Sequence, residues 1–185
     1  MRSFTWAATC LFIARSALAY DPYNITANYV INNKNYYART WYGDGELYIG
    51  SAVPEGVATV TNFTVPAVRA DLLYVEATGS DLNLADTTFL VVNNALGASE
   101  PVFFADDASG LDDDDLIYWF RYDTLLFPIF NDGTGQSYFY LAATSAPGTY
   151  LVKWVQGGIK SPHKPTSAAD LDGASVQLTA VAPNV

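Results

Sequence analysis

The stretch ITANYVINNKNYYARTWYGDGELYI, residues 25–49, decides the fold class. It begins with apolar residues that alternate with smaller or more polar ones, as in a half-buried β-strand: Ile25, Ala27, Tyr29 and Ile31. The NNKN at 32–35 predicts a turn, after which residues 36–42 form a second strand. The GDG at 43–45 predicts a tight turn into a third strand at 46–49, because glycine readily adopts positive φ.

The same texture continues through the rest of the chain. Short β-type runs, separated by glycine, proline, asparagine and aspartate, lie at 57–65, 72–77, 88–93, 101–105, 116–122, 125–130, 137–143, 149–155 and 175–181. No stretch carries a sustained apolar face of helical period, and residues 168–171 could form one helical turn at most. Regularly spaced short strands predict an all-β domain, an antiparallel sandwich or closed barrel of about ten to twelve strands.

Residues 1–19 are typical of a secretory signal peptide. Arg2 provides a basic start, an apolar run follows, and Ala17 and Ala19 provide a small-x-small cleavage site. The only cysteine, Cys10, lies within this segment. We therefore expect a secreted domain at residues 20–185 without disulfides, cysteine-ligated metals or a cysteine nucleophile, in the extracellular space or the cell wall.

The net charge and the sequence motifs limit the classes of partner that the protein can bind. The 185 residues carry a net charge of −10, and loss of Arg2 and Arg15 with the signal would leave seven basic and 19 acidic residues, or −12. Such a surface disfavours nucleic acid and anionic lipid. The C-terminal residues do not form a long apolar tail, so we expect no membrane anchor. Two sequons predict glycosylation at Asn24 and Asn62. The oligomeric state cannot be predicted from the sequence.

Residues that could support catalysis are few. His163 is the only histidine and lies between prolines, in a poor context for a Ser-His-Asp triad or a multi-histidine zinc site. A glycosidase requires only two carboxylates, for which Glu46 and Glu76 are the best pair because both lie in or beside aromatic strands. A carboxylate-based glycoside hydrolase or a small-molecule isomerase therefore stays an alternative, and no catalytic residue is assigned.

A run of acidic residues is the candidate metal site. Several carboxylates on one loop can surround calcium, which takes six to eight oxygen ligands. The candidates are Asp106, Asp107, Asp112, Asp113, Asp114 and Asp115. Their order is not that of an EF-hand, and a charged loop that is simply solvated is the interpretation that we favour over a calcium site. Calcium is the one cofactor that the sequence suggests.

Aromatic clusters beside polar residues are the candidate ligand site. Where one face of a strand is core, rings on the other face can stack on a sugar while amides and carboxylates bind its hydroxyls. The candidates are Trp41, Tyr42, Asp44, Trp119 and Tyr122. Of these we expect Trp41 to be the most exposed, because it lies near a strand end. The alternative is that packed sheets cover both faces.

Residues 44–48, DGELY, and the terminal VQL at 176–178 resemble the phialide-associated cell-wall proteins, which are small secreted β-rich proteins of filamentous ascomycetes. The resemblance implies a wall-associated protein without an assigned reaction. The function expected from the sequence is thus a secreted, non-catalytic wall or surface protein that contacts cell-wall glycans. A lectin-like carbohydrate-binding module is the nearest alternative.

Overall fold

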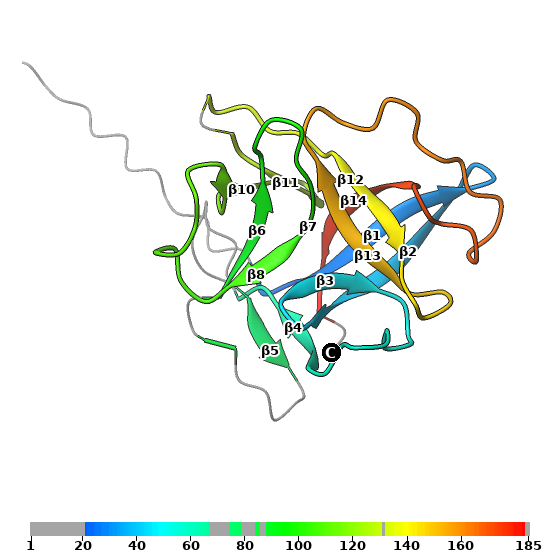
Figure 1. Cartoon of the computed structure of the whole chain (residues 1–185), viewed down its shortest axis with the longest axis horizontal. Helices are drawn as coiled ribbons and strands as arrows, with labels where there is room; N and C mark the ends of the chain where they lie inside the picture. The colour runs from blue at the N-terminus through cyan, green and yellow to red at the C-terminus, as the bar shows by residue number, and fades with distance from the viewer. Residues whose placement is uncertain (1–20, 67–74, 79–83, 86–87, 131, 184–185) are drawn as a thin grey trace, which may run out of the picture.

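The computed structural model describes residues 21–66, 75–78, 84–85, 88–130 and 132–183 (Figure 1). These residues form 14 strands and no helix, so the all-β prediction is confirmed. The strands are β1 (Asn24–Ile31), β2 (Lys34–Gly43), β3 (Glu46–Ile49), β4 (Val60–Thr64), β5 (Glu76–Thr78), β6 (Phe89–Asn93), β7 (Ser99–Pro101), β8 (Phe103–Ala105), β9 (Asp115–Leu116), β10 (Trp119–Tyr122), β11 (Leu125–Pro128), β12 (Phe139–Ala143), β13 (Tyr150–Val155) and β14 (Ser175–Val181).

Six strands close into a barrel. Each is antiparallel to its neighbours in the order β1, β2, β3, β13, β12 and β14, and β14 pairs with β1 to complete the ring. Closure of the ring pairs the backbone N–H and C=O groups that would otherwise be left unpaired along the edge strands. The remaining strands extend this sheet: β4 and β5 continue from β2, β8 joins β3 to β6, and the β10–β11 hairpin attaches to β14 (Figure 1).

The two predicted turns near the start of the chain are present, with a small shift in one strand boundary. Asn32 and Asn33 have φ of 48° and 62°, and Ile31 pairs with Lys34, so the turn has two residues and β2 begins earlier than predicted. Asp44 and Gly45 form the second two-residue turn, with φ of 44° and 88°. Positive φ at both central residues matches the twist of a hairpin.

Alternate residues of the barrel strands form the core. Ile25, Ala27, Tyr29 and Ile31 of β1 point inward, as their spacing predicts, and are buried. The largest side chains that are fully covered include Trp154, Phe63 and Phe139. Each large apolar side chain buried in this way contributes about 1.5–3 kcal/mol. The side chains at the other alternate positions of these strands point away from the core.

Two predicted strands are interrupted. The run at 101–105 becomes β7 and β8, because Val102 between them is buried and bonds through its N–H to Val152 and through its carbonyl to Leu47. The run at 116–122 likewise divides into β9, which pairs with β6, and β10, which pairs with β11. In both cases the chain changes partners within one apolar run, which a local pattern cannot show.

Residues 168–171 form hydrogen-bonded turns rather than a helix. The described segments contain no helix that is long and apolar enough to cross a membrane. The predicted signal peptide at 1–19 and the first part of the predicted strand at 72–77 lie outside the described residues.

Candidate functional site

Trp41 is a structural residue, and the prediction that it is exposed is wrong. Its side chain is only 8% exposed, and it stacks on Tyr48 of the neighbouring strand with ring centroids 4.6 Å apart. Its Nε1–H donates to the Gly50 carbonyl at 2.9 Å. Trp41 and Tyr48 are direct cross-strand partners, so each ring covers the other on the outer face of the β2–β3 hairpin.

Tyr42 and Asp44 also serve the fold rather than an open site. The Tyr42 ring packs edge-to-face against Phe104 at 5.0 Å, and burial raises the pKa of its hydroxyl. The Asp44 carboxylate accepts hydrogen bonds from the backbone N–H groups of Ala58 and Thr59, both at 2.7 Å. These bonds lower the pKa of Asp44 and tie the chain before β4 to the hairpin turn.

On β10 the two predicted ligand residues have opposite environments. Trp119 is 4% exposed, donates through Nε1–H to the Leu90 carbonyl at 2.9 Å, and lies parallel to Phe139 at 5.8 Å. It therefore belongs to the core, and its assignment to a ligand site is wrong. Tyr122 is 68% exposed. Strand alternation accounts for the difference, because residues an odd number of positions apart face opposite sides.

That alternation creates a row of exposed rings, which we call the aromatic strip: Tyr118, Phe120 and Tyr122, which are 52%, 45% and 68% exposed. Phe127 of β11 supports the strip from the same face, with its ring centroid 5.6 Å from that of Phe120. Only Tyr122 was predicted. The available signal was the period of two in residues 118–122, which places Trp119 inward and its neighbours outward.

The predicted carboxylate sites are not assembled. Asp106 accepts from the Thr88 hydroxyl at 3.0 Å, Asp107 accepts from Ser109, and Asp115 accepts from the Asp112 N–H. Among the described residues, no three histidine, cysteine, aspartate or glutamate side chains are grouped as metal ligands. The six aspartates are therefore not gathered into the predicted calcium site: Asp106 bonds to Thr88 in a distant segment, Asp107 and Asp115 bond within local turns, and Asp113 and Asp114 are exposed.

The two candidate glutamates are also separate. Glu46 accepts a 2.7 Å hydrogen bond from the Tyr48 hydroxyl and lines a hollow of about 280 Å³ with Glu100 and Asp115. Glu76 is exposed on β5 and does not line that hollow. The two glutamates thus lie on different strands, Glu46 on β3 and Glu76 on β5, in different surroundings.

The two sequons differ in accessibility. Asn24 lies on β1 with only 6% of its surface exposed, whereas Asn62 is exposed on β4. A glycan requires a side-chain amide that reaches solvent. In the folded chain the Asn62 side chain is thus accessible to solvent, whereas that of Asn24 is covered.

A groove lies on the outer face of β1 and β14. Its volume is about 670 Å³, within the range of roughly 300–1,000 Å³ typical of ligand pockets. The floor and one wall come from β1, β14 and the β1–β2 turn, and the other wall is the loop at 162–166. Most of its polar side chains are neutral: Asn28, Asn32, Asn33, Asn35, Thr166, Ser175 and Gln177. None of them was predicted as a site residue, because the loop and the strands are distant in sequence.

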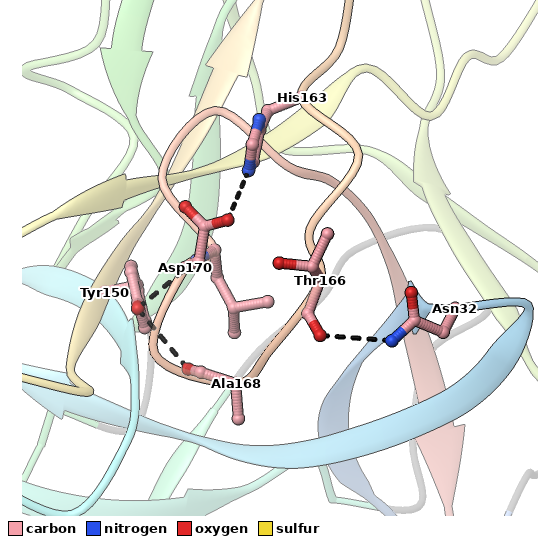
Figure 2. A network of polar contacts seen from close by, with 7 residues as sticks. Asn32, Tyr150, His163, Thr166, Ala168 and Asp170 are labelled. Atoms are coloured by element: carbon pink, nitrogen blue, oxygen red, sulfur yellow. Dashed lines mark hydrogen bonds and ion pairs between the residues drawn. The ribbon is translucent and has the colours of Figure 1, made fainter.

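Polar contacts hold this loop and the residues that follow it, 162–171 in all, against the barrel (Figure 2). The Asn32 side chain donates to the Thr166 carbonyl at 3.1 Å. The Tyr150 hydroxyl accepts from the Leu171 N–H at 3.3 Å and donates to the Ala168 carbonyl at 3.4 Å. His163 lies 3.1 Å from Asp170, but the aspartate is 50% exposed, so this pair is a weak surface contact rather than a buried catalytic dyad.

Comparison with known proteins finds no matching family model, no similar curated protein and no similar solved structure. The functional argument therefore rests on the geometry of the chain itself.

Proposed function

We propose that this is a secreted, non-catalytic protein of the cell wall or cell surface that contacts glycans through the aromatic strip. The observation that carries the proposal is the exposure of three rings at alternate positions, Tyr118 just before β10 and Phe120 and Tyr122 within it. Large exposed apolar side chains that lie together commonly mark an interaction surface. Secretion and the wall location are supported by the signal motif and by the resemblance of residues 44–48 to wall proteins.

The chemistry of the strip favours sugar over other partners. Aromatic faces accept the apolar C–H face of a pyranose ring, and the Tyr118 and Tyr122 hydroxyls add hydrogen-bonding groups at either end. Nucleic acid bases also stack on aromatic rings, but the net charge of −10 opposes a polyanion. A hydrolase is less well supported, because Glu46 is hydrogen-bonded to the Tyr48 hydroxyl while Glu76 is exposed on a different strand, β5.

Sedimentation with insoluble polysaccharides tests the proposal. The secreted protein is mixed with chitin, β-1,3-glucan or cellulose particles, and the bound fraction is measured as a function of polysaccharide concentration. We expect the wild type to bind at least one of these polymers. The triple variant Tyr118→Ser, Phe120→Ser and Tyr122→Ser should bind at least about tenfold more weakly, since an aromatic contact contributes about 0.5–1.5 kcal/mol.

Tyr37→Ser is the matched control, because Tyr37 is equally exposed at 61% but lies on β2, outside the strip. It should bind as the wild type does. Circular dichroism should show that both variants keep the β-sheet spectrum. Wild-type protein that sediments with none of the polymers, or a folded triple variant that binds equally well, would contradict the proposal.

A further inference from the structure

We infer that the groove on β1 and β14 is a second binding site, built for an extended, neutral oligosaccharide. It is distinct from the aromatic strip, with which it shares no residue. The inference goes beyond adhesion to a wall surface, since a groove with defined polar groups selects one chain from many.

The groove continues into a neighbouring hollow. That hollow has a volume of about 250 Å³ and is lined by residues that include Ser137, Tyr138 and Gly158. Pro162 and Ser175 line both spaces, so they form the junction between them. The two spaces are thus neighbours, and we take them as adjacent subsites for successive sugar units of one chain.

The floor of the groove holds a polar atom without a partner. The Asn28 Oδ1 atom is shielded from water and makes no hydrogen bond. An unpaired buried acceptor costs about 1–3 kcal/mol, and this cost disappears if a ligand supplies a donor. Asn28 also lines the groove, so a sugar hydroxyl bound there can supply this donor once the side chain shifts.

The neighbouring hollow repeats this feature. The Ser137 hydroxyl oxygen is also buried without a partner. Beside it, the Tyr138 ring packs against the backbone of Gly158, where an added Cβ would lie 3.1 Å from the ring and φ is +79°. Glycine thus allows the close approach that shapes this end of the path. Each of the two spaces is therefore lined by one residue whose buried polar atom lacks a partner.

The character of the lining identifies the ligand class. Asparagine, glutamine, serine and threonine side chains both donate and accept, as sugar hydroxyls do. Pro162, Pro165 and Val30 supply apolar surface for the C–H faces of a sugar. No carboxylate lines either space, which disfavours a cationic sugar. Lys164 and His163 line the groove and Lys160 lines the hollow, but the net charge of −10 on the whole protein opposes a long anionic chain.

Titration calorimetry with soluble oligosaccharides tests the inference. The probes are the mono-, di-, tetra- and hexasaccharides of β-1,3-glucose, of β-1,4-glucose and of N-acetylglucosamine, together with oligomers of galacturonic acid. We expect one neutral series to bind, with an affinity that rises at least about tenfold from the disaccharide to the hexasaccharide. The galacturonic acid oligomers should bind more weakly at the same length.

Two variants locate the binding. Asn28→Leu removes the unpaired amide and should weaken every length at least about tenfold, while thermal stability is kept, since an apolar replacement of an unpaired polar group is not costly. Ser175→Phe places a bulky ring at the junction and should remove the gain from added length only. Ser99→Phe, at an exposed position of β7 outside both spaces, is the control and should titrate as the wild type does.

Several results would overturn the inference: no oligosaccharide binds, all lengths bind equally, only the acidic oligomers bind, or Asn28→Leu and Ser175→Phe behave as the wild type. Failure here is distinguishable from failure of the proposed function. Normal titration by these two variants, together with loss of sedimentation in the aromatic-strip variant, would reject the groove and retain the strip. Normal sedimentation of the aromatic-strip variant, together with weakened titration by Asn28→Leu and Ser175→Phe, would reject the strip and retain the groove.

Discussion

The indole ring of Trp41 lies against the ring of Tyr48, with the two planes 14° from parallel and the indole N–H bonded to the Gly50 carbonyl. This contact closes the outer face of the β2–β3 hairpin. Gly43 packs beneath it, because an added Cβ there would lie 2.7 Å from the indole. The most prominent aromatic residue of the early sequence therefore stabilises the barrel.

Replacement of Trp41 should reduce stability without reducing glycan binding. We expect Trp41→Ala to lower the free energy of unfolding by about 3–5 kcal/mol, because a large buried ring is lost. Trp41→Phe keeps a ring but loses the hydrogen bond to Gly50, so it should cost less. Urea denaturation measures both effects. Polysaccharide sedimentation of the folded variants should match the wild type, and a selective loss of binding would show that Trp41 contacts ligand.

Glycosylation should be confined to one of the two sequons. Expression in a eukaryotic secretory host should give protein with a glycan at Asn62, which is exposed, and none at Asn24, which is 6% exposed. Mass spectrometry of glycopeptides before and after enzymatic deglycosylation measures this. Asn62→Gln should remove the mass difference and Asn24→Gln should leave it. A glycopeptide that contains Asn24 in folded, secreted protein would be inconsistent with the buried position.

Asp44 should make stability depend on pH. Its hydrogen bonds to Ala58 and Thr59 lower its folded pKa below the ordinary value of 3.8. A lowered pKa means that the carboxylate stabilises the fold above that value and loses this effect as the pH falls through the folded pKa. Asp44→Asn should therefore lower the melting temperature at neutral pH, and the difference from wild type should close in acid.

The control for this measurement is Asp113→Asn, which removes one charge from an exposed position elsewhere on the chain. Its melting temperature should follow that of the wild type across the whole pH range. A gap between wild type and Asp44→Asn that stays constant into strong acid would show that the carboxylate charge is not what stabilises the turn.

Calcium should not stabilise the protein through the run of aspartates at 106–115. Asp107 is bonded to Ser109 and Asp115 to Asp112, so their carboxylates serve separate turns. A ligand that binds only the folded state raises its stability in proportion to the logarithm of its concentration. We expect equal melting temperatures in excess calcium and in chelator. A rise that increases with calcium concentration, and that is lost in Asp112→Asn, would reinstate the metal site.

Local patterns in the chain were sufficient for most of the strands and for the first two turns, although not for the breaks between β7 and β8 and between β9 and β10. Alternation from Ile25 to Ile31 places one face of β1 in the core whatever the partner strands are. Asn32, Asn33, Asp44 and Gly45 adopt positive φ because their own side chains permit it, so these turns are encoded by the residues that form them. For the same reason the all-β class could be predicted.

Only the tertiary structure decided which aromatic residues are covered and where a site forms. Trp41 and Tyr122 both lie near the turn end of an aromatic-rich strand, but Trp41 meets Tyr48 across a hairpin while Tyr122 meets no covering strand among the described residues. The groove depends on a contact between Asn32 and Thr166, which are 134 positions apart. Such surfaces arise when the barrel closes and brings distant segments together, and burial energy acts on that final arrangement rather than on any local pattern.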